Sequence, residues 1–300
     1  MKRNEKAIAA AFILSAALYV FSFTPVISGR HKEKLVQSAL LNPKYEKDIS
    51  EITITSGSSS VILERHSNGI WIGKSGKNIF PAEQKTVSNM IEHLAKVRNM
   101  YKISDSTRQY QNLGLSENDA VTVMYKIKDN MSTILYFGGQ NYEQNRRYIR
   151  SKSSKTSYEI ESDIDTYITV SENFWSDPFL IPKNMIPDSD IKTQRVSLGN
   201  IKISSDKDKP LLDKIESLRH GKLCDTVQGP VISVLDAYSG DGTHIHADIR
   251  TIIGVKDMVF TYRIDNSVTG TNDMIQYSSV VSSWTYGRLL EYFKKQYSEL

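Results

Sequence analysis

The stretch that decides the fold spans residues 231–250 and reads VISVLDAYSGDGTHIHADIR. Its second part alternates between apolar and polar side chains, and the apolar positions are Ile245, Ala247 and Ile249. Because successive side chains of a β-strand point to opposite faces, this alternation predicts a strand with one buried face. The glycines in residues 240–243 predict the tip of a hairpin that returns the chain. We therefore expect antiparallel sheet in this region.

The segments around this hairpin extend the pattern in both directions. Short strands are expected at residues 196–198 and 201–203, across the turn at Gly199-Asn200, and two more at residues 258–264 and 274–277. A helix is expected near Pro210. A closing helix is indicated by apolar residues at helical spacing, namely Tyr286, Leu289, Leu290, Phe293 and Tyr297. The second half thus has the order of two strands, a helix, four strands and a helix.

The first half shows a similar order of expected elements. Strands are expected at residues 52–63, a hairpin at Asn68-Gly69, and four further strands between residues 121 and 160. The helix that begins at Pro81 carries an apolar stripe, made of Val87, Met90, Ile91, Leu94 and Val97. A second helix is expected from Asp163 towards Trp175. The expected fold class is α+β, with one N-terminal transmembrane helix followed by two similar, mostly antiparallel-sheet α+β units.

The transmembrane helix is expected at residues 7–28, AIAAAFILSAALYVFSFTPVIS, which carry no charge. As a helix, this segment is roughly 33 Å long, enough to cross a hydrocarbon core of about 30 Å. Lys2, Arg3 and Lys6 precede it and favour a cytoplasmic N-terminus, although further basic residues follow. A cleaved signal peptide and a buried soluble helix are the alternatives. The long apolar core and the missing Ala-x-Ala site favour a retained anchor.

This anchor sets the expected domain organisation and location. Four parts are expected: the anchor at residues 1–28, a juxtamembrane spacer at 29–47, a first α+β unit at 48–180 and a second at 181–300. The spacer is expected to form a short helix that Pro43 ends, and the proline-rich residues 177–187 contain the boundary between the units. The protein is expected in the cytoplasmic (inner) membrane as a single-pass protein with a periplasmic domain.

Composition excludes several functions. The net charge is +4 without a run of five basic residues, so nucleic acid is not an expected partner. Cys224 is the only cysteine, which rules out an intrachain disulfide, and we expect it to be a small, buried or half-buried side chain. No catalytic or cofactor-binding motif stands out, so the protein is not expected to be an enzyme and no cofactor is expected.

The one spacing typical of a metal site is formed by His244, His246 and Asp248. On a strand the three side chains share a face, within reach of one ion, and Asp241 is the obvious additional ligand. Because the opposite face is apolar, a solvated strand face is the simpler interpretation, and no metal site is predicted. Residues 146–150, RRYIR, predict an edge strand protected by charge, with an anion-binding strand as the alternative.

Several short motifs follow one another between about residues 45 and 185. They are Gly69-Ile70-Trp71, Phe80-Pro81-Ala82, the segment YQNLGL at residues 110–115, Leu135-Tyr136-Phe137-Gly138, Tyr148-Ile149-Arg150 and Tyr158-Glu159-Ile160. In this order they resemble a bacterial family of membrane-anchored domains of unknown function, associated with gliding-motility-type ABC transporter components. Trp175-Ser176-Asp177 departs from the Leu-Arg-Asp usual there. The resemblance implies an extracytoplasmic partner of an ABC-type membrane assembly and no catalytic residues.

The expected function is that of a non-enzymatic single-pass envelope protein, whose extracytoplasmic domain is an accessory or scaffold subunit of an ABC-transporter-like complex. The expected partners are the lipid bilayer, through residues 7–28, and permease-like or ATPase-like proteins. One alternative is an anchored ligand-binding or sensor module with a cleft between the two repeats. A second is a metal-dependent envelope hydrolase that uses His244, His246 and Asp248.

Overall fold

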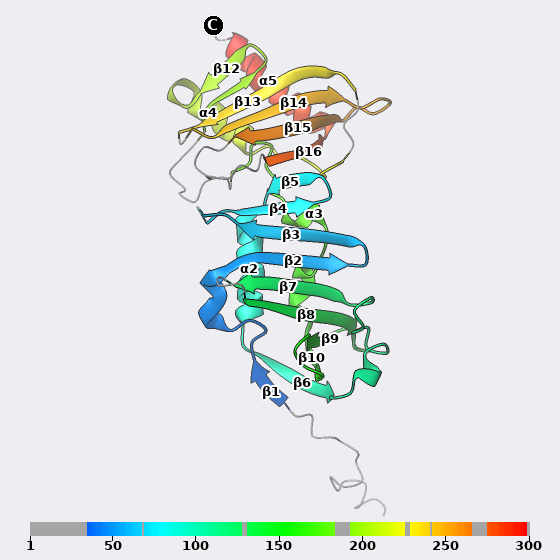
Figure 1. The fold of residues 1–300 in the computed structure, drawn as a ribbon. Coiled ribbons are helices and arrows are strands. Elements are labelled where there is room, and N and C mark those ends of the chain that lie inside the picture. The colour runs from blue at the N-terminus through cyan, green and yellow to red at the C-terminus, as the bar shows by residue number, and fades with distance from the viewer. Residues whose placement is uncertain are drawn as a thin grey trace, which may run out of the picture.

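The computed structural model describes residues 35–67, 69–127, 131–183, 193–225, 229–240, 242–265 and 275–298. Within these residues sixteen strands form two sheets, in which every neighbouring pair is antiparallel. The two sheets follow one another along an elongated body (Figure 1).

The first sheet has ten strands. In spatial order they are β1 (Leu35–Ser38), β6 (Arg98–Ser104), β10 (Ser157–Glu161), β9 (Arg146–Ser151), β8 (Met131–Gln140), β7 (Val121–Ile127), β2 (Ile49–Ser56), β3 (Ser59–Arg65), β4 (Trp71–Ser75) and β5 (Asn78–Pro81). The alternation of the sequence sets which side chains are buried: Ile52 and Ile54 of β2 are fully buried, whereas Thr53 between them is partly exposed.

The second sheet has six strands and lies beyond β5. In spatial order they are β12 (Ile201–Ser204), β11 (Thr193–Leu198), β13 (Val231–Ser239), β14 (His244–Thr251), β15 (Met258–Asp265) and β16 (Ile275–Val281). Two helices, α4 (Ser205–Glu216) and α5 (Ser283–Ser298), pack against each other and against the β12 side of this sheet. They bury Leu212, Ile215, Leu289 and Phe293.

The helical elements of the first unit are short. They are η1 (Pro43–Asp48), α2 (Gln84–Ala95), η2 (Thr107–Gln109), η4 (Ser162–Tyr167) and α3 (Glu172–Trp175). The apolar stripe of α2 is buried as expected at Val87, Met90, Ile91 and Leu94. Val97 is 60% exposed, because the helix ends at Ala95 and Lys96 has extended backbone angles.

The strand order of the second sheet occurs again within the first. The order β12-β11-β13-β14-β15-β16 has the same connectivity and direction as β3-β2-β7-β8-β9-β10. In the second unit α4 follows the first pair of strands directly and four consecutive antiparallel strands come after it. In the first unit β4 and β5 precede α2, and β6 lies between α2 and the four strands β7 to β10. The first sheet adds β4 and β5 at one edge and β6 and β1 at the other.

The expected α+β class is wrong, because in the described chain residues in antiparallel strands far outnumber those in helices. Two expected helices are not found as continuous helices among the described residues. The spacer instead contains β1, which pairs with β6, and η1, which begins at Pro43 where the missing amide hydrogen costs no hydrogen bond. The segment from Asp163 to Trp175 is divided between η4 and α3. In the part of the chain that the structure describes, no helix is long and apolar enough to cross a membrane. Residues 7–28 lie outside it.

The junction between the sheets is filled by two connecting segments. Ser176 forms a bridge with Ala82 beside β5, Phe179 pairs with Arg219, and Leu223 pairs with Ser279 of β16. Figure 1 shows β5 and β16 on either side of this junction. A single cluster of buried apolar side chains includes members from both sides, among them Trp175, Leu180, Leu218 and Phe260.

Polar side chains also join the two units. Asn78 of β5 is 4% exposed, and its Oδ1 accepts a hydrogen bond from the Ser278 backbone N of β16 (3.4 Å). Its Nδ2 donates to Glu172 Oε2 (3.2 Å) and to Asp225 Oδ1 (3.1 Å). Asn78 thus connects four segments of the chain.

We expect Asn78→Ala to destabilise the fold by about 2–3 kcal/mol, because buried polar groups lose their partner. Urea unfolding measures this loss. The exposed Asn112→Ala is the control and is expected to change stability by less than about 0.5 kcal/mol. Equal stability of the two variants would contradict the role of Asn78 at the junction.

The carboxylate of Glu172 has a pH-dependent effect on stability. Burial, together with the charge of Asp225, raises the pKa of Glu172, although the Asn78 hydrogen bond opposes this shift. A carboxyl whose pKa is raised on folding stabilises the protein below its unfolded pKa and loses that contribution as the pH rises. Glu172→Gln should therefore raise the unfolding midpoint in urea at pH 7 relative to the native protein, and this gain should shrink towards pH 4. Exposed Glu92→Gln, the control, should show no such trend.

Candidate functional site

The candidate site lies on the hairpin of β13 and β14. The Ser239 backbone N donates to the Thr243 carbonyl O across the turn (3.0 Å), and the resulting register places Asp236 opposite His246 and Tyr238 opposite His244. Paired residues and residues two apart on a strand share a face, so these four side chains project from one side of the sheet. The opposite side buries Leu235, Ala237, Ile245 and Ala247.

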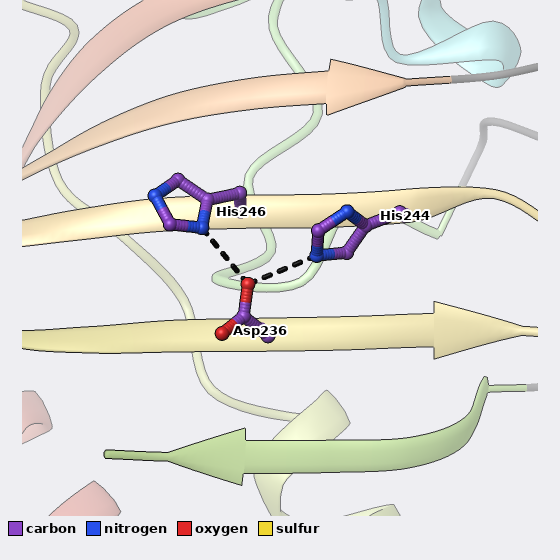
Figure 2. Close-up of side chains that lie close together, drawn as sticks. All are labelled: Asp236, His244 and His246. Carbon is purple, nitrogen blue, oxygen red and sulfur yellow. Dashed lines mark hydrogen bonds and ion pairs between the residues drawn. The ribbon is translucent and has the colours of Figure 1, made fainter.

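Three of these side chains converge on one point (Figure 2). Asp236 Oδ1 lies 2.9 Å from His244 Nε2 and 2.9 Å from His246 Nδ1. One ligand atom of each residue lies within 4.8 Å of the others. The side chains are 24% to 31% exposed, so the cluster is held by the sheet and is still open to solvent.

The charge of Asp236 is stabilised by its two neighbours. Burial raises the pKa of Asp236, but the hydrogen bonds and positive charge of His244 and His246 outweigh burial and hold its pKa below the ordinary value. The His244 ring also stacks on Tyr238, with centroids 4.4 Å apart, and the Arg195 guanidinium lies 4.3 Å from the centre of the Tyr238 ring. These contacts restrict the orientation of the His244 ring.

The structure places His244 and His246 together, as their spacing suggested, but separates Asp248 from the shared point. Asp248 Oδ2 lies 3.3 Å from Arg263 Nη2 and 3.6 Å from Arg250 Nη2, and its Oδ1 is 3.4 Å from the outer nitrogen of His246, Nε2. Asp241 lies outside the described residues.

Asp236 is the residue that sequence reasoning missed. It lies eight residues before His244, and only strand pairing brings it to the two imidazoles. The signal was present in the hairpin, because a turn at residues 240–242 makes partner positions in the two strands equidistant from the tip. Counting outward from the turn pairs Asp236 with His246.

Two imidazole nitrogens and a carboxylate oxygen are donors that suit zinc and similar transition metals, which take His and Asp ligands at about 2.0–2.2 Å. A hard ion such as Ca²⁺ or Mg²⁺ prefers oxygen ligands. A water molecule would complete four-coordination on the exposed side.

The arginines of β9 do not form an exposed anion site, and β9 is not an edge strand, because it lies between β10 and β8. Arg147 donates to Asp165 Oδ2 (3.0 Å) and to the Gly138 carbonyl O (2.6 Å). Arg150 is buried, donates from Nε to the Leu115 carbonyl O (2.9 Å), and stacks against Tyr136 at 3.8 Å. Both side chains therefore stabilise the first unit.

A cavity of about 240 Å³ lies within the first unit. Its apolar lining comes from β1, β6, β8 and β9 and includes Val36, Met100, Leu135 and Ile149. This cavity is thus distant from the junction of the two sheets. A ligand-binding or sensor module with a cleft between the repeats would need a cavity at that junction. The junction itself is packed with side chains of the shared core.

Cys224 and His220 take part in that packing. The Cys224 backbone N donates to the Ser278 carbonyl O (2.9 Å), and the side chain is half-buried, as expected. The two ring nitrogens of His220 lie 2.7 Å from the Gly221 O and 2.8 Å from the Asp177 O. Burial lowers the pKa of His220. Both ring nitrogens lie within hydrogen-bond distance of backbone carbonyl oxygens.

We expect Asp236→Asn to destabilise the protein by about 1–2 kcal/mol at pH 7, because charge-assisted hydrogen bonds to both imidazoles are lost. A carboxyl whose pKa is lowered on folding stabilises the protein above its unfolded pKa, about 3.9, and loses this contribution as the pH falls through its folded pKa. The difference between native protein and variant should thus diminish below about pH 4. Urea unfolding from pH 7 to pH 3 checks this, and a difference that grows on acidification would contradict it.

Part of this chain is similar to a known protein family. Residues 75–220 match the family described as Domain of unknown function (DUF4340), a region that extends from β4 through the junction to just beyond α4. An uncharacterized protein of Treponema pallidum (strain Nichols) is 23% identical over 173 residues, which cover 55% of this chain and 54% of that protein. The chain thus matches about half the length of this relative. No solved structure matches this chain. Residues 75–220 are therefore similar to the DUF4340 family, which agrees with the resemblance of the sequence motifs to a family of domains of unknown function.

Proposed function

We propose that this chain is a non-enzymatic accessory or scaffold subunit of an ABC-transporter-like membrane complex. In this proposal residues 7–28 contact the lipid of the cytoplasmic membrane, and the two sheets lie on its extracytoplasmic side. Permease-like or ATPase-like chains are the protein partners.

The observation that carries the proposal is an exposed apolar surface at one end of the second sheet. It consists of Val231, Ile232, Ile253, Val255 and Trp284, and we refer to it as the apolar end surface. Their exposed fractions run from 42% for Val231 to 82% for Ile253, and Trp284 is 70% exposed. Exposed apolar side chains that gather in one place typically mark a protein interaction site.

Strand pairing brings these five residues to the same end. Val231 begins β13 opposite Arg250 near the end of β14, and Thr251 pairs with Met258 at the start of β15. Met258 in turn pairs with Val281 at the end of β16. The β14–β15 loop, with Ile253 and Val255, projects beyond the sheet (Figure 1).

The start of α5 completes the surface. The Ser283 backbone N donates to Asp257 Oδ1 of the β14–β15 loop (2.9 Å), which holds Trp284 close to that loop. The Arg288 guanidinium lies 5.6 Å from the centre of the Trp284 ring. Trp and Arg are enriched among the residues that dominate binding energy at protein interfaces.

The test is purification of the full chain from native membranes in mild detergent after cross-linking, with mass spectrometry of the copurifying chains. We expect an ABC-type permease and ATPase in comparable amounts. The double variant Ile253→Ser with Trp284→Ser should reduce their recovery by at least about tenfold, since each truncation of an interface anchor costs about 2 kcal/mol.

Tyr142→Ser is the matched control. Tyr142 is fully exposed but belongs to the first unit, so its replacement should leave recovery unchanged. Recovery of the native chain without transporter subunits would refute the proposed complex. Unchanged recovery with the double variant would instead show that the partners bind another surface.

A further inference from the structure

We propose that Asp236, His244 and His246 form a binding site for one divalent transition-metal ion of the zinc class, with Asp248 positioning the ring of His246. This inference is independent of the transporter proposal, because the cluster lies at the hairpin tip, at the other end of the β13 and β14 strands from the apolar end surface.

The separations of the donor atoms fit a shared ion. Ligand atoms about 2.0–2.1 Å from a tetrahedral zinc ion are about 3.3 Å from one another. Asp236 Oδ1 is 2.9 Å from each of the two facing nitrogens, and the ligand atoms of all three residues lie within 4.8 Å of one another, so adjustments of the side chains would bring them around one ion.

The outer nitrogen of His246 has the partner that a metal-bound histidine requires. Histidine ligands characteristically donate the N–H of their second nitrogen to a carboxylate, which fixes the tautomer and the ring orientation. His246 Nδ1 faces Asp236 and His244, and its Nε2 faces Asp248 Oδ1 at 3.4 Å. With the proton on Nε2, the lone pair of Nδ1 points to the shared site.

The sheet holds this arrangement in place without the ion. The two histidines are two residues apart on β14, Asp236 is directly across on β13, and β15 pairs with the far side of β14. Asp248 is itself held by Arg263 and Arg250. His244 stacks on Tyr238 with an angle of 4° between the rings. Side chains restricted in this way lose little freedom when they bind an ion.

A metal-free cluster is the competing explanation. In that state the carboxylate only accepts hydrogen bonds, so the nitrogens of His244 and His246 that face Asp236 carry the protons. Metal binding would move the His246 proton to Nε2, next to Asp248. The two explanations thus differ in whether an ion displaces these hydrogen bonds.

The experiment uses the full chain, without a polyhistidine tag, in mild detergent. Zn²⁺ is titrated against a chromophoric chelator, and Co²⁺ is used to record the visible absorption of a four-coordinate site. We expect one ion per chain. Asp236→Asn, His244→Gln and His246→Gln should each weaken Zn²⁺ binding by more than about 100-fold, and Asp248→Asn by about 10-fold.

His93→Gln is the matched control. His93 is a partly exposed histidine on α2 in the first unit, and its replacement should leave affinity and stoichiometry unchanged. A native chain that binds no Zn²⁺ above the background of the His244→Gln variant would overturn the proposal. So would native affinity in the Asp236→Asn variant. Because the Co²⁺ spectrum is read on the native chain, the test holds even if one variant fails to fold.

Discussion

The constraint on which the structure depends is that the backbone groups along β5 and β16 need hydrogen-bond partners at the junction of the two sheets. The chain meets this need with its own connecting segments, so that Leu223 pairs with Ser279 and Ala82 with Ser176. Asn78 then links both units through its side chain. The two sheets therefore share one apolar core instead of being joined by an open linker. This packing at the junction joins the two sheets end to end in one elongated body.

The second sheet separates two surface features along the same strands. The hairpin tip at one end positions Asp236, His244 and His246, while the other end exposes Ile253 and Trp284. Antiparallel pairing produces this separation, because the turns of a sheet alternate between its two ends. A partner chain on the apolar end surface would therefore leave the side chains of Asp236, His244 and His246 open to solvent.

The family match crosses the junction and so includes the elements that form it. Residues 75–220 contain β5, both bridges from the first connecting segment, and α4 of the second unit. Strand order is shared between the second sheet and the central six strands of the first. The arginines of β9 stabilise the interior of the first sheet. Arg150 is buried there, and its guanidinium lies over the rings of Tyr136 and Tyr110. A strand with three arginines resembles a protected edge until its neighbours are known.

The sequence by itself determined the local pattern. Strict alternation in residues 244–249 defined a half-buried strand, and helical spacing placed Val87, Met90 and Leu94 in the core, because these periodicities follow from backbone geometry alone. Tertiary structure decided the rest. Pairing with β6 made a strand of Leu35–Ser38, where local sequence favoured a helix, and the predominance of antiparallel strands overturned the expected α+β class. Strand register also selected Asp236 in place of Asp248 as the acid between the histidines. Strand pairing and register depend on cross-strand neighbours that are far away in the sequence, and the local periodicity of the side chains does not reveal these neighbours.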